Sequence, residues 1–259
     1  MNQILNYLSY LFKSTNLHGI HSPLVYSLVK DVIYKRKDKS EKFKSIEAIR
    51  KELIKERSLI SGLDFGAGSS SNSSQKTIGD FARSSSKSVK FSRLLYRLSK
   101  WQQPKYALEL GTALGISGMY QTIGFGDSAK FITLEGNSLL AAKAQKNYKK
   151  LNFNSIEIIE GNFDNTLSIA LEKMPQLDWV FFDGNHKKEP TIRYFHQCLE
   201  KASEKALFIF DDINWSAEMQ EAWDEIKQHA KVYITIDLFF LGLVFLEKRP
   251  QKEHFIVRF

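Results

Sequence analysis

The chain reads ALELGTALGIS over residues 107–117, a short apolar strand that leads into a turn with two glycines and then into the start of a helix. Gly111 lets the backbone leave the strand at an angle that a side chain would obstruct. Gly115 lets the next helix and any ligand come close to the main chain. The free N–H groups that open this helix face the carboxyl end of the strand, so they suit a phosphate or an amino-acid carboxylate. The stretch predicts a ligand site.

The next strand helps to identify the ligand. Residues 131–136 read FITLEG, and an acid at Glu135, at the end of a second strand, is suited to accept hydrogen bonds from a ribose diol. The spacing of Gly111 and Gly115 lacks the central glycine of a dinucleotide fingerprint. Glu109 would repel a second phosphate and favour a cationic ligand. S-adenosylmethionine (SAM) has a ribose, a carboxylate and two positive centres, so it fits better than NAD.

These two motifs resemble those of the class I SAM-dependent methyltransferases, and most closely the catechol-type O-methyltransferases that act on small molecules. The resemblance covers roughly residues 84–247. It implies a cofactor site built by the glycine turn, the second strand and the strand ends beyond them. The alternative is a Rossmann-like strand and turn that binds another ligand or none. The predicted cofactor contacts of the two motifs are Glu109, Gly111, Thr112, Ala113, Gly115, Ser117, Glu135 and Gly136.

The same resemblance implies cofactor contacts outside the two motifs. Ser86 and Ser88 precede a helical pattern, at the place where the resembled enzymes cover the methionine end of the cofactor. Asn162 or Phe163, after the third strand, would contact the adenine, although the family usually has Asp where this chain has Asn162. Asp183, after the fourth strand, is also expected to reach the cofactor.

The order of strands and helices predicts the fold class. Apolar strands alternate with helical patterns after residue 105, which predicts a parallel sheet covered on both faces. Residues 232–236 and 241–246 are joined by a link too short for a crossover helix, so they are expected to form an antiparallel hairpin. We expect an α/β, Rossmann-like, seven-stranded, mostly parallel sheet, as the resemblance also implies. The five strands expected before the hairpin are 106–110, 131–135, 156–160, 178–182 and 206–210.

Length and local composition predict the domain organisation. The 259 residues, 43% of them hydrophobic, suit one α/β domain with an N-terminal helical extension. We expect the extension over residues 1–83 and the SAM-binding domain over residues 84–259. The extension contains a serine-rich loop at 64–74 that imitates a nucleotide-binding loop, although no adequate strand leads into it.

Charge and cysteine content indicate the setting of the protein. Residues 1–60 hold twelve Lys and Arg against six Asp and Glu, which is +6 of the formal +8. Such a face could attract nucleic acid, but residues 35–39 are interrupted by an acid and lack aromatic residues, which argues against it. The single cysteine, Cys198, excludes an intrachain disulfide, and the first residues lack the basic character of a signal peptide. No apolar run comes near the roughly 20 residues of a membrane span, so we expect a soluble cytoplasmic protein. We also expect a homodimer.

Three acids follow the fourth and fifth predicted strands. Asp183 ends one of them, and Asp211 and Asp212 end the other, so their carboxylates are expected at one edge of the sheet. Their repulsion requires a cation, and hard oxygen ligands indicate Mg²⁺ or another divalent ion. The resemblance agrees, because metal-dependent O-methyltransferases of this type bind their ion at these places. The alternative is that Asp211 or Asp212 caps the next helix without a metal.

His186 is the predicted catalytic base. Its ordinary pKa near 6.5 lets it accept a hydroxyl proton at neutral pH. Lys187 is the alternative base, because the catechol-type enzymes have a lysine there, and His186 would then be a loop residue. We therefore predict O-methylation of a small-molecule hydroxyl, with Asn185 and Trp215 shaping the acceptor pocket. A catalytically silent SAM-binding or scaffolding protein and an N- or RNA methyltransferase are the alternatives.

Overall fold

The computed structural model describes residues 3–35, 38–60, 76–126 and 128–259. The chain forms two compact units, one from Met1–Lys35 with Met174–Phe259 and the other from Arg36–Lys173. We call them the terminal unit and the central unit. The predicted boundary between residues 83 and 84 stays a prediction, and the serine-rich segment 64–74 lies outside the described residues. None of the described helices is long and apolar enough to cross a membrane.

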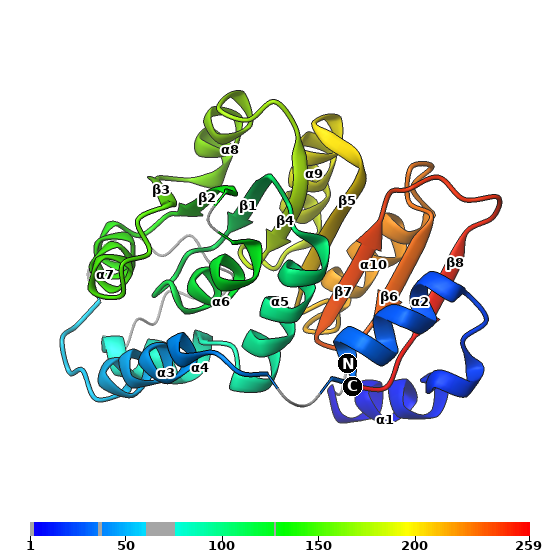
Figure 1. The fold of residues 1–259 in the computed structure, drawn as a ribbon, viewed down its shortest axis with the longest axis horizontal. Helices are drawn as coiled ribbons and strands as arrows, with labels where there is room; N and C mark the ends of the chain where they lie inside the picture. Colours follow the sequence, from blue (N-terminus) through cyan, green and yellow to red (C-terminus); the bar gives the residue numbers. More distant parts are fainter. Residues whose placement is uncertain (1–2, 36–37, 61–75, 127) are drawn as a thin grey trace. The chain divides into compact units, whose positions relative to one another are not determined.

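The central unit carries three parallel strands in the order β3-β2-β1 (Figure 1). In β1, side chains on both faces of the strand are buried, as the apolar pattern predicts for a parallel sheet. Helix α5 packs against α6, and α3 packs against both α4 and α6. The elements in chain order are α3 (Glu41–Ile54), α4 (Ile78–Ser85), α5 (Val89–Gln102), β1 (Tyr106–Leu110), α6 (Ile116–Phe125), β2 (Lys130–Glu135), α7 (Ser138–Lys150), β3 (Ile156–Glu160) and α8 (Phe163–Glu172).

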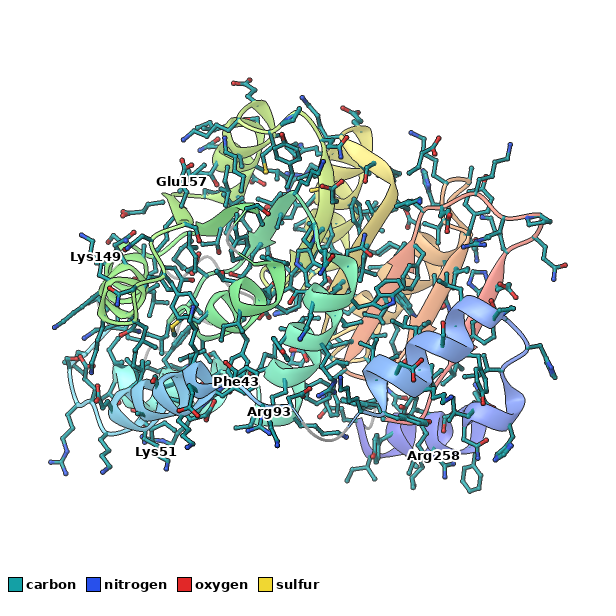
Figure 2. The ribbon with its side chains drawn as sticks, in the orientation of Figure 1. Phe43, Lys51, Arg93, Lys149, Glu157 and Arg258 are labelled. Atoms are coloured by element: carbon teal, nitrogen blue, oxygen red, sulfur yellow. The ribbon has the colours of Figure 1, made fainter. Side chains whose placement is uncertain are left out.

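An aromatic cluster fills the core between helices of the central unit. The ring of Phe43 stacks on Tyr120 with centroids 5.1 Å apart and meets Tyr96 edge-on at 4.9 Å. The Arg93 guanidinium carbon lies 5.4 Å from the centroid of Phe43, and both residues can be followed in Figure 2. Tyr120 also donates a hydrogen bond to Glu47 at 2.9 Å. The cluster thus joins α3, α5 and α6 by apolar burial and one polar contact.

The terminal unit carries five strands in the order β4-β5-β7-β6-β8. Strand β7 runs antiparallel to both β5 and β6, which confirms the predicted hairpin, while β4 is parallel to β5 and β8 to β6. The elements in chain order are α1 (Gln3–Lys13), η1 (Leu17–Gly19), α2 (Pro23–Leu28), η2 (Val29–Ile33), β4 (Leu177–Phe182), α9 (Lys188–Glu200), β5 (Ala202–Asp211), α10 (Ala217–Gln228), β6 (Ile234–Asp237), β7 (Leu241–Phe245) and β8 (Glu253–Ile256).

The strand count corrects one prediction. The described residues hold eight strands, and the predicted number of seven was wrong because β8 was missed. Strand β8 has only four residues and is not fully buried on either face, so it lacks a clear period-2 signal. The strand forms because it pairs with β6, and the local sequence does not indicate that pairing.

The N-terminal helix is tied to the C-terminal end of the chain within the terminal unit. The Tyr10 hydroxyl donates to the Val257 carbonyl at 2.6 Å and accepts from the Phe259 N–H at 3.0 Å. Arg258, labelled in Figure 2, donates to the Leu11 carbonyl at 2.7 Å. The part of residues 3–60 that the structure describes is largely helical, as predicted for the N-terminal extension, and Gln3–Lys13 belongs with the last strands.

Candidate functional site

The glycine turn lies in the central unit, where the chain passes from β1 to α6. Gly111 and Gly115 have φ values of 106° and 82°, in the region that favours glycine. Ala113 lies between them with a φ of 49°. The N–H groups of Gly111 and Thr112 both donate to the Leu134 carbonyl at 3.0 Å. The turn is therefore held against the end of β2, as a ligand site between the two strands requires.

Glu135 links this turn to the next helix. Its carboxylate accepts hydrogen bonds from the Ala113 N–H at 2.7 Å and from the Asn137 N–H at 2.9 Å. The residue is 8% exposed. A carboxylate is an acceptor of the kind that hydroxyl groups of a ligand require. Gly136 follows directly, before the Asn137 cap of α7.

Glu109 has a different environment. It is fully buried, and its Oε1 accepts from the Ser117 hydroxyl and the Gln121 amide, both at 2.7 Å. Its Oε2 accepts from Thr133 at 2.8 Å. Thr133 has one proton to donate, so Thr112, whose hydroxyl lies 2.7 Å from that of Thr133, donates to it. Glu109, Ser117 and Thr112 thus hold β1, β2 and α6 together under the turn.

The remaining predicted cofactor residues of the central unit lie at helix ends. Ser86 is the C-cap of α4, and Ser88 is the N-cap position of α5 without a capping side-chain bond. Asn162 is the N-cap of α8 and accepts from the Asp164 N–H at 3.0 Å. Phe163, half-buried, is the first residue of that helix. The Asn162 amide can still donate while its oxygen caps the helix.

Two residues of α7 that were not predicted from the sequence reach the turn. The Asn147 amide donates to the Leu114 carbonyl at 2.9 Å. The Tyr148 ring lies against the backbone of Gly115 and its hydroxyl against that of Gly118. Helical periodicity marks Tyr148 as a core position, but no local pattern shows that its neighbour is the turn rather than another helix.

A second group of candidate residues lies in the terminal unit, after β4 and β5. Ligand atoms of Asp183, His186 and Asp211 all lie within 4.8 Å of one another. Asp211 is buried at 1% exposure, whereas Asp183 and His186 are half-buried. The His186 Nε2 lies 4.0 Å from Asp183 Oδ1. Two carboxylates and an imidazole fit a divalent ion, and the carboxylate oxygens suit Mg²⁺ or Mn²⁺.

Asp212 does not lie in this group. Its φ is 53°, its N–H donates to the Phe240 carbonyl at 2.7 Å, and its carbonyl accepts from the Trp215 N–H at 2.9 Å. The following helix, α10, is capped by Ser216, which accepts from the Met219 N–H at 3.1 Å. The alternative in which Asp211 or Asp212 caps that helix was therefore wrong.

The other predicted residues of this region are the exposed Lys187 and Trp215 and the half-buried Asn185. Lys187 is exposed and occupies the N-cap position of α9, and Asn185 has a φ of 53°. Trp215 is 59% exposed. Lys187 and Trp215 are thus both accessible to a molecule in solution.

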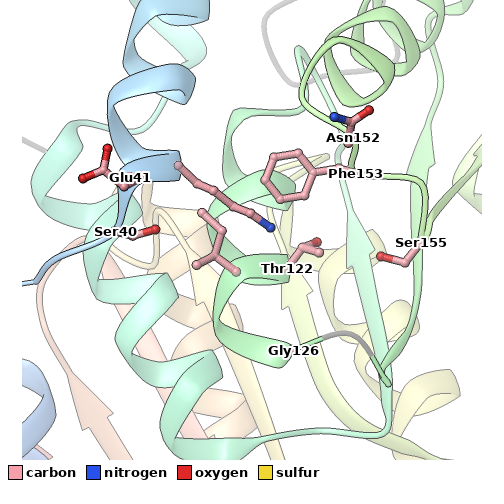
Figure 3. Close-up of a pocket in the computed structure, with 9 residues that line it drawn as sticks. Ser40, Glu41, Thr122, Gly126, Asn152, Phe153 and Ser155 are labelled. Carbon is pink, nitrogen blue, oxygen red and sulfur yellow. The ribbon is translucent and has the colours of Figure 1, made fainter.

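A cavity of about 230 Å³ in the central unit contains none of the predicted site residues. It lies at the C-terminal end of α6, away from the turn at its N-terminal end (Figure 3). Its lining includes Lys42, whose Nζ is 5.3 Å from the centroid of Phe153. We do not assign the cavity to the predicted site.

Comparisons with known proteins connect these features to a family. Residues 108–213 match the family model described as "Methyltransferase domain". A catechol O-methyltransferase of Niastella koreensis is 31% identical over 133 residues, which are 48% of this chain and 55% of the relative. The chain therefore spans about half the length of this curated relative.

Solved structures share the fold. An O-methyltransferase from Bacillus cereus in complex with SAH is 17% identical with a TM-score of 0.58, over 86% of this chain and 97% of that one. An SAH-bound methyltransferase of Podospora anserina is 13% identical with a TM-score of 0.62, over 88% and 97%. The chain thus shares its Rossmann-like fold with these methyltransferase structures.

Proposed function

We propose that this chain is a SAM-dependent O-methyltransferase that acts on a hydroxyl group of a small molecule. The observation that carries the proposal is the hydrogen bond from the Ala113 N–H to Glu135 across the glycine turn, inside the stretch that matches a methyltransferase domain. An acid held at that place suits a ribose diol, and the helix start beside it suits the cofactor's carboxylate.

Each predicted cofactor residue has a part in this proposal. Glu135 binds the ribose, and residues 111–115 with Gly136 bring the main chain close to the cofactor. Asn162 or Phe163 contacts the adenine, and Ser86 and Ser88 cover the methionine end. Glu109 and Ser117 hold the turn in shape, which their mutual hydrogen bond supports. Asp183 was predicted both to reach the cofactor and to bind the metal, and we propose metal binding as its main role.

The residues after β4 and β5 would act on the acceptor. Asp183 and Asp211 would hold a divalent ion, with Asp212 as the further predicted ligand, and such an ion lowers the pKa of a bound hydroxyl. His186 takes the acceptor's proton, or Lys187 does so if His186 is a metal ligand. The acceptor oxygen would then form a bond to the methyl carbon of SAM as the carbon–sulfur bond breaks. The electron pair of the broken bond would stay on sulfur. Asn185 and Trp215 shape the acceptor pocket.

Calorimetry with SAM, SAH and NAD tests the cofactor assignment. We expect SAM and SAH to bind and NAD not to bind, and binding of NAD alone would favour a dehydrogenase. A screen of hydroxylated aromatics, sugars and polyketide-like acceptors, with and without Mg²⁺, then tests the reaction. Transfer to an amine alone would contradict the hydroxyl assignment, and SAM binding without any transfer would favour a silent binding protein. A homodimer is a further proposal, which light scattering tests.

A further inference from the structure

Tyr148 fills the space that two glycines leave open at the cofactor turn. A Cβ atom at Gly115 would lie 2.6 Å from Tyr148 Cε1 and 2.9 Å from Cζ. A Cβ atom at Gly118 would lie 2.6 Å from the Tyr148 hydroxyl oxygen. Real Cβ atoms essentially never lie within 3.0 Å of another heavy atom, so Tyr148 packs closely against both glycines. The ring packs against Gly115, and the hydroxyl packs against Gly118.

The surroundings of the Tyr148 hydroxyl are unusual for a core tyrosine. The residue is fully buried, and its hydroxyl has no hydrogen-bond partner among the residues that the structure describes. The Cβ position at Gly118 is also 3.2 Å from Glu109 Oε2, so the hydroxyl and the carboxylate approach the same side of α6. Burial, and the negative charges of Glu109 and Glu135, raise the pKa of Tyr148, which keeps the hydroxyl neutral.

A buried hydroxyl without a partner is destabilising, so its presence needs a reason. Packing alone would be served by phenylalanine, which has the same ring. The distinctive contact of the hydroxyl is with the backbone of α6 at Gly118. Asn147, the preceding residue, is bonded to the turn at Leu114, so two successive residues of α7 position the segment from Leu114 to Gly118.

We propose that Tyr148 is a positioning residue of the cofactor-binding turn, with its ring setting the place of the backbone at Gly115 and its hydroxyl setting the distance to α6 at Gly118. This inference rests on the proposed function, because the turn matters through the cofactor. It explains why residue 118 is glycine within a helix. Alanine is normally better than glycine within a helix. At residue 118 its methyl group would lie too close to the Tyr148 hydroxyl.

The test is a cycle of variants at Gly118 and Tyr148, with SAM and SAH affinity measured by calorimetry on the full chain. We expect Gly118→Ala to weaken binding at least tenfold, because the new methyl group displaces either α6 or the tyrosine. Tyr148→Phe should weaken binding about threefold, because it leaves a gap at Gly118. In the double variant the methyl group occupies the space of the missing oxygen, so affinity should return to within about twofold of wild type.

Gly115→Ala with Tyr148→Phe is the matched control. The clash at Gly115 involves ring carbons that phenylalanine keeps, and the φ of 82° disfavours alanine, so no recovery is expected. Thermal unfolding without ligand shows which variants fold. Additive losses in the Gly118/Tyr148 cycle, or recovery of thermal stability without recovery of affinity, would overturn the positioning role. Absence of SAM and SAH binding by the wild-type chain would instead remove the proposed function itself.

Discussion

At the scale of single residues, two acids that the sequence analysis treated alike have different environments. Glu109 lies within β1 and Glu135 ends β2, and both were predicted to face the ligand. Glu109 accepts hydrogen bonds from the side chains of Ser117, Gln121 and Thr133. Glu135 instead accepts from the backbone N–H groups of Ala113 and Asn137. Sequence position predicted that both acids belong to the site region. The direction of the Glu109 side chain depends in part on Gln121, which neither motif includes.

Replacing Glu135 by alanine should weaken SAM binding by about 1.5–3 kcal/mol, the range for hydrogen bonds to a charged group. The ribose contacts and the bond to the Ala113 N–H would both be lost. Calorimetry measures the change. Glu160→Ala is the matched control, since Glu160 pairs with Glu135 across β2 and β3 but is exposed. Equal losses in the two variants would contradict a specific role for Glu135.

At the scale of elements, the strands could be predicted closely because most are buried apolar runs. Strands β1 and β3 have the predicted bounds, and β2 and β4 each begin one residue earlier. Strand β5 begins at Ala202, four residues before the prediction, because its first part is polar. It joins the sheet through a register shift between Leu177 and Trp179 of β4. Such a strand is extended by pairing with a neighbouring strand, and a local sequence pattern does not reveal that pairing.

Helix α8 provides a test that separates a cap from a ligand contact at Asn162. Asn162→Ala should lower the free energy of unfolding by about 1 kcal/mol, because the Asp164 N–H loses its acceptor. Asn162→Asp keeps a capping oxygen and should keep most of the stability, while it loses the amide donor. Chemical denaturation and SAM calorimetry on both variants distinguish the roles. If the aspartate variant binds SAM as tightly as wild type, the Asn162 amide does not donate to the adenine.

The last residue of β6 is an acid, Asp237, whose titration should affect stability. Burial raises the pKa of Asp237, which accepts from the Phe239 N–H at 2.7 Å. A raised pKa in the folded state means that folding favours the protonated acid. Its stabilising effect is complete below the ordinary pKa of 3.8 and is lost as pH rises through the higher folded value.

The free energy of unfolding of wild type relative to Asp237→Asn should therefore fall as the pH is raised from about 3.5 to 7. Asparagine keeps an acceptor for the Phe239 N–H and does not titrate. Urea unfolding at several pH values measures the difference. The exposed Asp31→Asn, in the same unit, serves as control. A difference that stays constant with pH would show that the carboxyl of Asp237 titrates as it does in the unfolded chain.

At the scale of the whole molecule, the division into units was beyond sequence reasoning. The extension predicted over residues 1–83 is shared between the two units, since Met1–Lys35 belongs to one and the following helices to the other. The contacts that decide this, such as Tyr10 with Val257, join residues 247 positions apart. Periodicity places Ile4, Leu8 and Phe12 on one face of the first helix, but these side chains are exposed, and the buried residue of the helix is Tyr10.

The two sets of candidate residues also lie in different units, which makes their functions separable. The turn and Glu135 belong to the central unit, and the group formed by Asp183, His186 and Asp211 belongs to the terminal unit. A chelator should therefore abolish methyl transfer and leave SAM affinity within about twofold of its original value. Asp211→Asn should act in the same way, because an amide is a weaker ligand for a hard ion than a carboxylate is.

Asp212→Asn is the informative comparison, because Asp212 lies outside the group although it adjoins Asp211. If Asp183, His186 and Asp211 hold the ion, the Asp212 variant should keep most of its activity and its response to added Mg²⁺. A loss as large as that of Asp211→Asn would restore Asp212 as a ligand. Full activity in excess chelator would remove the metal from the mechanism, and a parallel loss of SAM affinity would contradict the separation of the two sets.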